Sequence, residues 1–440
     1  MTRFIRAVSI SALVALGALG APVVSHAQDS TFKGITLNGV YDPTKDKIAV
    51  AVLPIPGTIG DSVRAMIQRD FEFSDRFTIV RVDTTDMAAL RSGAAGKLNY
   101  PLFARLAAIA VVQITPVPTG LHVALHDVAT SQVVHVGEMP LATAVFSRDW
   151  RMGVHRTSDE VEQWMTGKRG IAATRIAYMR GQAIRIVDSD GASEITVPTE
   201  PDASSPSWSP NGGTLAYSTF GANSRIMLMD LTTGRSRTLV GPTRNVNYST
   251  PMFSPNGQSI VYSRSNDDQT DLYLAPVDRP EGGQRLTTQR GFLNSNPVFS
   301  PDGRQIVYVT NISGPPELYI MDADGTGARK LTDYDFDTRN YRSDPDWSPD
   351  GRLIAYQERV KDTFQLRHIR VSGSTPKWLT SEGENEQPAW APDGRHLVFT
   401  SNRTGTRQLW IMDVESGTLR QLTKSGGSRL ASWSTRLATP

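Results

Sequence analysis

Two histidines four residues apart, His122 and His126, have a spacing at which two side chains can share a metal ion. They lie in Leu121-His-Val-Ala-Leu-His126, where apolar and polar residues alternate as in a β-strand. A strand separates side chains four positions apart by roughly 13 Å. We therefore expect a solvated strand face at this place and not a metal site.

Two further segments begin like a calcium-binding loop: Asp188-Ser-Asp-Gly191 and Asp322-Ala-Asp-Gly325. An EF-hand loop needs additional ligands and a glutamate at its twelfth position, and neither segment supplies them. Both are expected to be turns. The chain also lacks Gly-x-Ser-x-Gly, the nucleophile motif of the α/β-hydrolases. No catalytic residue, metal or cofactor is therefore predicted.

The stronger candidates for binding are four polar stretches, residues 244–250, 291–296, 340–344 and 383–387, each followed by a proline. They mix amide, aromatic and arginine side chains, which suit protein interfaces. Plain solvated loops would tolerate the same residues. The side chains that we assign to a partner surface are Asn245, Asn247, Tyr248, Thr250, Asn294, Ser295, Asn296, Tyr341, Arg342 and Asp344.

These stretches recur because the second half of the chain is a repeat. An aromatic residue followed by Ser-Pro-Asp-Gly, or a close variant, occurs five times at a nearly constant interval, and a sixth copy breaks off after its aromatic residue. The anchor aromatics are Trp208, Phe253, Phe299, Trp347, Trp390 and Trp433, spaced 45, 46, 48, 43 and 43 residues apart. A period of this length is typical of propellers and other repeat architectures.

Each repeat contains the parts of one propeller blade. Proline presets the second position of a type I turn, and glycine accepts the left-handed residue that closes it. Three further strand-like segments follow the turn, for example Ile306-Val-Tyr308, Glu317-Leu-Tyr-Ile-Met-Asp322 and Leu331-Thr332. Four strands per repeat predict an all-β propeller.

The two ends of the repeat region complete each other. The chain ends in Ala431-Ser-Trp-Ser434, an inner strand without its blade, and the region opens with Thr174-Arg-Ile-Ala-Tyr178, a second strand without an inner one. Joined, they make a sixth blade and leave no open sheet edge. We predict six blades closed by pairing of the N- and C-terminal strands of the propeller, over residues 171–440.

Residues 28–168 do not follow the repeat and predict a small α/β domain with helices on a mixed sheet. Strands are expected at 47–54, 77–82, 108–115, 121–127 and 132–139, and helices at 61–71 and 150–166. Asn99-Tyr-Pro101 is typical of a helix start. The opening segment before the first strand is expected to be mobile.

Residues 1–27 are typical of a secretory signal peptide, with Arg3 and Arg6 before an apolar core and Ser25-His26-Ala27 as the cleavage site. Its removal leaves 44 basic and 44 acidic side chains out of 46 and 44. A neutral protein offers no electrostatic basis for nucleic-acid binding. The absence of cysteine excludes disulfides and thiol catalysis.

The mature sequence resembles the TolB family of the periplasmic Tol-Pal system. The most specific segments are His155-Arg-Thr-Ser-Asp-Glu-Val161, Thr166-Gly-Lys-Arg-Gly-Ile-Ala-Ala-Thr-Arg-Ile-Ala-Tyr178 and Gln113-Ile-Thr-Pro-Val117. The turn motif alone is less specific, because Trp-Ser-Pro-Asp-Gly also occurs in the propellers of prolyl-oligopeptidase-like peptidases.

The resemblance implies a non-enzymatic periplasmic adaptor that supports outer-membrane integrity and invagination during cell division. Its propeller would bind the peptidoglycan-associated lipoprotein Pal, and its mobile N-terminal segment the inner-membrane protein TolA. Other outer-membrane proteins would be further partners, and membranes would be reached only through partners. For TolA the expected contact residues are Gln28, Asp29, Ser30, Thr31 and Phe32.

A second hypothesis is a periplasmic peptidase or hydrolase component gated by the propeller. It requires a nucleophile and a base within hydrogen-bond reach of each other.

Overall fold

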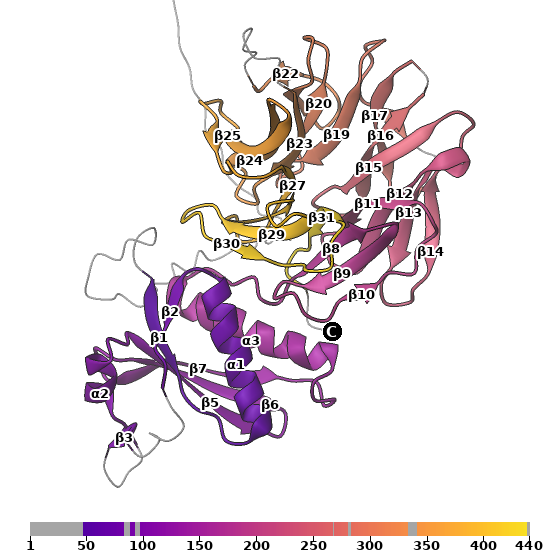
Figure 1. Cartoon of the computed structure of the whole chain (residues 1–440). Coiled ribbons are helices and arrows are strands. Elements are labelled where there is room, and N and C mark those ends of the chain that lie inside the picture. The colour runs from indigo at the N-terminus through magenta and orange to yellow at the C-terminus, as the bar shows by residue number, and fades with distance from the viewer. Residues whose placement is uncertain are drawn as a thin grey trace, which may run out of the picture. The chain divides into compact units, whose positions relative to one another are not determined.

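The computed structural model describes residues 47–82, 89–92, 97–266, 268–279, 283–332 and 341–437. Figure 1 shows an N-terminal part built from helices and one larger sheet, followed by a ring of small sheets. The predicted signal peptide and the segment assigned to TolA lie outside the described residues.

The N-terminal part has one five-stranded mixed sheet, as predicted. Its strands β1 and β2, and β1 and β5, pair in parallel, whereas β5, β6 and β7 form an antiparallel meander. In sheet order the strands are β2 Phe77–Ile79, β1 Ile48–Val52, β5 Ala110–Val117, β6 Gly120–Asp127 and β7 Gln132–Pro140. The helices are α1 Thr58–Phe73, α2 Tyr100–Arg105 and α3 Arg148–Thr166, and β3 Arg91–Ser92 pairs with β4 Lys97–Leu98.

Local sequence accounts for these helices. The side chain of Asn99 accepts a hydrogen bond from the backbone of Leu102 at the start of α2, the cap expected from Asn99-Tyr-Pro101. Two residues cap helix α3. The hydroxyl of Ser147, before the first turn, accepts a hydrogen bond from the backbone of Trp150, and Gly167, after the last turn, has the left-handed conformation with φ 73°.

The sheet buries both faces. Apolar side chains of α1 and α3 pack on the face that carries Val50, Val52 and Val112. Phe103 of α2 packs in a second cluster with Ala51 and Val111, which point to the opposite face because side chains alternate along a strand.

The rest of the chain forms six antiparallel four-stranded blades. Blade 1 is β10–β9–β8–β31, and blades 2 to 6 follow as β11–β14, β15–β18, β19–β22, β23–β26 and β27–β30. The strands of blades 1 to 3 are β8 Arg175–Arg180, β9 Ala183–Asp188, β10 Ile195–Thr196, β31 Ser428–Trp433, β11 Ala203–Trp208, β12 Thr214–Thr219, β13 Arg225–Asp230, β14 Ser236–Val240, β15 Asn247–Phe253, β16 Ser259–Ser265, β17 Thr270–Pro276 and β18 Gln284–Arg285. Blades 4 to 6 comprise β19 Asn294–Phe299, β20 Gln305–Thr310, β21 Glu317–Asp322, β22 Arg329–Lys330, β23 Arg342–Trp347, β24 Leu353–Val360, β25 Thr363–Arg370, β26 Lys377–Trp378, β27 Asn385–Trp390, β28 His396–Ser401, β29 Gln408–Asp413 and β30 Leu419–Gln421, and the short helix η2 Gly221–Asn223 connects β12 to β13.

The repeated turn has the predicted geometry. In blade 4 the amide of Gly303 donates to the carbonyl of Ser300 at 2.8 Å, and Gly303 has a φ of 73°. The hydroxyl of Ser300 accepts from the amide of Gln305 at 2.9 Å and so fixes the hairpin that follows. The anchor aromatics are buried, with Phe299 7% exposed, which confirms that they are packing residues.

The ring is closed as predicted. Strand β31 pairs antiparallel with β8, placing Trp433 opposite Ile176. The indole nitrogen of Trp433 donates to the hydroxyl of Thr174 at 2.8 Å, and Ser434 exchanges two further hydrogen bonds with the backbone of Arg175. Residues 259 positions apart in the chain are thereby joined in one sheet.

A chain that ends after Leu430 should lose most of the stability of the propeller. Loss of a buried tryptophan alone costs about 3–5 kcal/mol, against a total of about 5–15 kcal/mol for a typical domain, and the shortened β31 can no longer complete blade 1. Thermal unfolding followed by circular dichroism measures the effect. A truncated protein that melts within a degree or two of the full chain would contradict closure by these strands.

Candidate functional site: the propeller channel

The innermost strand of every blade carries the same irregularity. One residue stands in the left-handed conformation, and the pairing register with the second strand shifts beside it. Such a shift is a β-bulge, which bends the strand and redirects its side chains. The six residues, which we call the bulge ring, are Ser205, Thr250, Asn296, Asp344, Gln387 and Leu430, with φ between 48° and 55°.

The bulge ring lines the channel. All six residues border a cavity of about 330 Å³, together with the prolines that follow five of them and the anchor tryptophans. A left-handed conformation is unfavourable for residues other than glycine, most of all for β-branched or bulky ones such as Thr250 and Leu430. Strain that recurs at equivalent positions around a cavity points to a functional surface.

Hydrogen bonds hold four of the six ring residues in two pairs and fix a fifth, Thr250, to the second strand of its blade. The amide of Asn296 donates to the carboxylate of Asp344 at 2.9 Å, and the side-chain carbonyl of Gln387 accepts from the backbone of Leu430 at 3.0 Å. The hydroxyl of Thr250 lies 2.8 Å from that of Ser263. The ring therefore presents ordered polar groups over an apolar wall.

Among the described residues, two carboxylates line the channel, Asp344 and Asp346, and no lysine or arginine does. Burial raises the pKa of Asp344. Burial also raises the pKa of Asp346 to about 7, although its carboxylate accepts a hydrogen bond from the backbone of Trp390. The negative charge of the channel therefore grows as the pH rises toward neutrality.

Replacing Asp346 by asparagine should stabilise the protein above neutral pH. The folded state holds the proton of Asp346 up to about pH 7, whereas the unfolded chain releases it near pH 4, so the carboxylate progressively lowers stability across this interval. Asparagine keeps the acceptor for Trp390 and carries no charge. We expect a free energy of unfolding at least about 1 kcal/mol higher at pH 8, and no gain at pH 4.

Denaturant titrations of both proteins at the two pH values provide the measurement. Equal stability at pH 8 would show that Asp346 ionises in the channel without cost.

The predicted binding residues divide into three groups. Thr250, Asn296 and Asp344 belong to the bulge ring. Residues that lie outside the cavity and are at least partly exposed are Asn245, Asn247, Ser295 and Tyr341. Residues that are buried are Tyr248, Asn294 and Arg342, which are 3%, 5% and 4% exposed.

The assignment of the three buried residues to a partner surface is wrong, because their side chains are bonded inside the propeller. Arg342 donates to Glu317 at 2.6 Å and to Glu358 at 3.1 Å, a buried ion pair within blades 4 and 5. Tyr248 packs in the core between blades 2 and 3, and its hydroxyl donates to Thr243 at 2.8 Å. The amide of Asn294 donates to the carbonyl of Thr270 at 3.2 Å.

Sequence reasoning missed other residues of this end of the propeller. Ser205, Gln387 and Leu430 complete the bulge ring, and for two of them the available signal was their place directly before a proline. The loops around the ring also expose Phe220 at 45% and Leu293 at 51%. Both loops lie at the end where the inner strands begin, because Ala203 pairs with Thr219 and Asn294 with Thr310.

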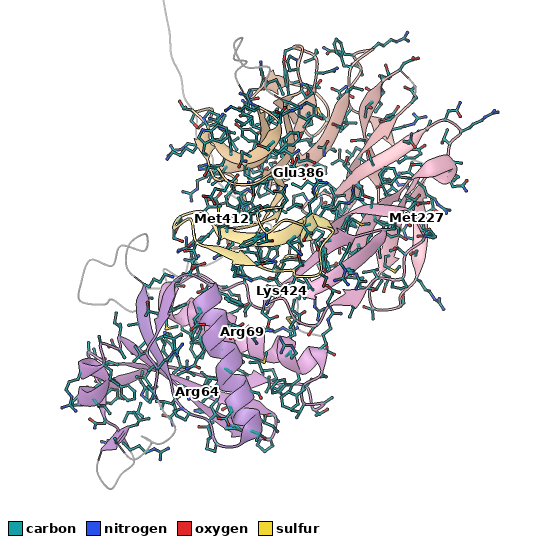
Figure 2. All side chains as sticks on the ribbon, viewed as in Figure 1. Arg64, Arg69, Met227, Glu386, Met412 and Lys424 are labelled. Atoms are coloured by element: carbon teal, nitrogen blue, oxygen red, sulfur yellow. The ribbon has the colours of Figure 1, made fainter. Side chains whose placement is uncertain are left out.

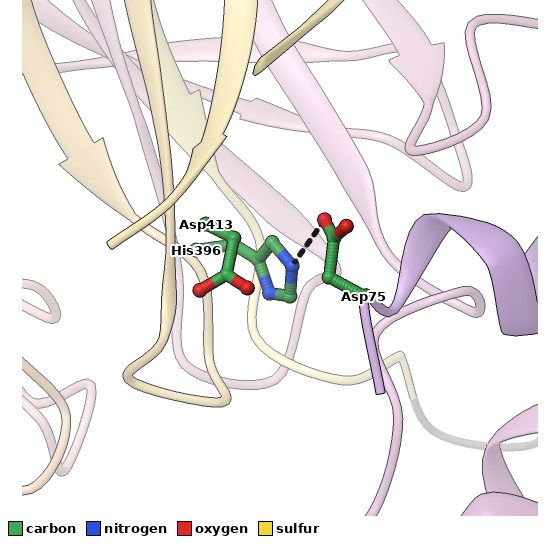
Figure 3. Close-up of side chains that lie close together, drawn as sticks. All are labelled: Asp75, His396 and Asp413. Carbon is green, nitrogen blue, oxygen red and sulfur yellow. Dashed lines mark ion pairs between the residues drawn. The ribbon is translucent and has the colours of Figure 1, made fainter. Parts of the chain in front are cut away.

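A second concentration of polar groups joins the α/β domain to the propeller. His396 is fully buried, and its Nδ1 lies 2.7 Å from Asp393. Its Nε2 lies 3.5 Å from Asp75, which follows α1; Figure 3 shows this ion pair beside Asp413. The surrounding carboxylates outweigh burial and raise the pKa of His396 to about 9. The imidazole is therefore charged at neutral pH, and the stability it contributes is lost as the pH rises through about 9.

A matching arrangement surrounds His155 of α3. Its Nδ1 lies 2.8 Å from Asp70 and its Nε2 3.8 Å from Asp190 of the propeller. Asp190 also accepts from Arg151 at 2.8 Å and lies 3.5 Å from Arg69, which is labelled on α1 in Figure 2.

These clusters are ion-pair networks and not metal centres. Asp413, beside His396, has both carboxylate oxygens engaged by Arg395 and accepts a further bond from Ser416. The carboxylate of Asp190, beside His155, accepts hydrogen bonds from Arg151 and from the backbone of Ala192. A divalent cation would have to displace these arginines.

One serine, histidine and aspartate do meet in the α/β domain, but in the wrong order for a nucleophile. The hydroxyl of Ser158 donates to Asp70 at 2.6 Å, and His155 binds the same carboxylate. No imidazole nitrogen faces this hydroxyl to accept its proton, and Ser158 is 2% exposed. The geometry gives no support to a serine hydrolase at this place.

The remaining candidates from the sequence are the histidine pair and the two Asp-x-Asp-Gly segments. The expected solvated strand face is correct for His122, which lies 2.6 Å from Glu138, and wrong for His126, which is 5% exposed and lies 2.9 Å from the hydroxyl of Tyr100. The two Asp-x-Asp-Gly segments are turns, with Asp190 and Asp324 accepting from the backbone two residues later. Of the helices in the described ranges, none is both long and apolar enough to cross a bilayer.

The chain is therefore an α/β domain followed by a closed six-bladed β-propeller. The two ends of the repeat region close the propeller, and the bulge ring lines its channel. A family model described as the TolB β-propeller domain matches residues 162–437. The chain belongs to this family.

Among curated relatives, the Tol-Pal system protein TolB of a Polaromonas species is 33% identical over 197 residues, and that of Escherichia fergusonii is 32% identical over 201 residues. These matches span 42% and 41% of this chain and only 43% and 44% of the relatives' own lengths. The crystal structure of TolB from Acinetobacter baumannii superposes with a TM-score of 0.74 over 89% of this chain and 97% of that chain, at 22% identity, and so shows a shared fold.

Proposed function

We propose that this protein is a non-enzymatic periplasmic adaptor of the Tol-Pal system, which binds Pal at the mouth of the propeller channel and TolA through its N-terminal segment. Two findings support a place in the Tol-Pal system: the chain belongs to the TolB β-propeller family, and its relatives are named Tol-Pal system protein TolB. In this role the protein contributes to outer-membrane integrity and to invagination during division.

The observation that carries the Pal site is the bulge ring with its exposed rim. Strained polar residues line the channel, and Phe220, Leu293 and Tyr341 expose 45%, 51% and 41% of their surface around it. Interfaces combine a few large apolar anchors with ordered polar groups. A folded partner could rest on the rim and insert a polar segment toward Asn296 and Asp344.

Replacing Tyr341 by alanine should weaken Pal binding without lowering stability. Tyr341 is 41% exposed and contacts Phe364 edge to face on the surface of blade 5, so its removal leaves the blade core intact. Loss of a central aromatic anchor costs about 2 kcal/mol or more, some thirtyfold in affinity. Ser295→Arg, which places a bulky cation beside the ring, should have a similar effect.

Calorimetric titration of Pal into each variant measures this. The control is Phe146→Ala, which removes an aromatic side chain from the α/β domain that is even more exposed, at 59% against 41% for Tyr341. Unchanged affinity in both Tyr341→Ala and Ser295→Arg, with unaltered circular dichroism, would move the Pal site away from the channel mouth.

Deleting residues 28–34 should abolish TolA capture and leave Pal capture unchanged. A short peptide segment can add a strand to the edge of a partner sheet, and residues 28–34 lie outside the described residues. Pull-down with purified TolA and Pal tests both halves at once. TolA binding of native affinity by the shortened protein would place that contact elsewhere.

A further inference from the structure

Blades 1 and 3 share a tyrosine and an arginine in equivalent strands. Ile176-Ala-Tyr-Met-Arg180 in β8 corresponds to Ile260-Val-Tyr-Ser-Arg264 in β16. Across the next strand pair, Tyr178 faces Arg185 in blade 1, and Tyr262 faces Tyr273 in blade 3.

In blade 1 this frame holds a carboxylate that belongs to the chain. The hydroxyl of Tyr178 donates a hydrogen bond to the carboxylate of Glu194. Arg180 approaches the same carboxylate at 2.8 Å and Arg185 at 2.7 Å. Two arginines and a phenol thus surround one anionic group with charge-assisted hydrogen bonds.

In blade 3 the register places a glycine where blade 1 has that glutamate. Glu194 precedes Ile195, which pairs with Ile186, and Gly283 precedes Gln284, which pairs with Leu274. The two pairs are equivalent, because each lies one position beyond the residue that faces the tyrosine. A Cβ built on Gly283 would lie 2.5 Å from the hydroxyl of Tyr262. The side-chain direction at this position therefore points at the tyrosine, as it does in blade 1.

A cavity lies beside this position, where the hydroxyl of Tyr262 approaches Gly283. It has a volume of about 340 Å³, and Tyr248, Tyr262, Arg264, Tyr273 and Gly283 border it. We call it the blade 3 pocket. Arg264 donates to the hydroxyl of Tyr273 at 2.9 Å, and its guanidinium carbon lies 5.1 Å from the ring centroid.

The pocket contains the guanidinium of Arg264, for which the described residues provide no counterion. Within the described ranges no acidic side chain pairs with Arg264, and the hydroxyl of Tyr262 makes no hydrogen bond to another described residue. The hydroxyl of Tyr248 is satisfied by Thr243 and adds an aromatic wall. A partly buried guanidinium and a free phenol are the groups that an incoming carboxylate would satisfy.

We propose that the blade 3 pocket binds a carboxylate that the chain itself does not provide, carried either by a small organic acid or by the terminus or an acidic side chain of a peptide. Arg264 would bind the anion, and Tyr262 would donate to it as Tyr178 donates to Glu194. The proposal rests on the comparison of two blades and is independent of the proposed adaptor role.

Titration of the full chain, carrying ¹³C-labelled tyrosine, with succinate tests the proposal. The ring resonances of Tyr262 and Tyr273 should shift with succinate and stay in place with succinamide, its neutral isostere. Acetylated tripeptides with a free or an amidated C-terminus form the second arm. Tighter binding of the free-acid peptide than of succinate would assign the site to peptides, and the reverse order would assign it to small acids.

Arg264→Gln should weaken succinate binding by at least about tenfold, because hydrogen bonds to a charged group are lost. The control is Arg290→Gln, which makes the same charge change at an exposed position in the connection between blades 3 and 4. Glu194→Gly should open an equivalent pocket in blade 1, so that the resonance of Tyr178 also responds. If that variant fails to fold, the comparison of Arg264→Gln with Arg290→Gln still decides.

Several outcomes would overturn the proposal: no response to succinate, an equal response to succinamide, or full binding by Arg264→Gln. Glu281 lies outside the described residues but close in sequence to Gly283. Succinate binding that emerges only in Glu281→Gln would show that the chain supplies its own carboxylate, and this too would overturn the proposal.

Discussion

Pairing of β31 with β8 is the contact on which the propeller depends. Every other blade is built from consecutive strands, so its pairing is local in sequence. Blade 1 alone takes its innermost strand from the far end of the chain. Without that strand, β8 has a free edge, the indole of Trp433 leaves Thr174, and the bulge ring loses Leu430. The channel exists as a closed surface because one long-range pairing completes it.

The local pairing within the other five blades explains why local sequence predicted the architecture well. Turn chemistry and alternation are properties of short segments, and in a propeller they repeat six times, so the frame follows from them. The α/β elements were likewise predictable, because Asn99 and Gly167 act on residues only a few positions away. The two-residue strands β3 and β4 lacked any such pattern and were missed.

The binding surface was harder to predict, because burial depends on partners distant in sequence. Nothing next to Arg342 indicates that Glu317 and Glu358 will enclose it, since they lie 25 and 16 positions away. His126 follows the alternation of an exposed strand, yet the register of β6 and β7 shifts beside it and Tyr100 covers it. Conversely, Leu430 carries no visible mark of its place in the ring, because alanine follows it where the other members have proline.

The pairing of β31 with β8 also determines when the propeller can be completed during synthesis. Blade 1 is opened by the first strand of the propeller and completed by residues 428–433, so the ring cannot close until almost the whole polypeptide has emerged. Blades 2 to 6 can form earlier, each with an exposed inner edge, and such edges are prone to mispairing. Closure of the ring is therefore the last step in the folding of this propeller, and it requires the synthesis of residues 428–433.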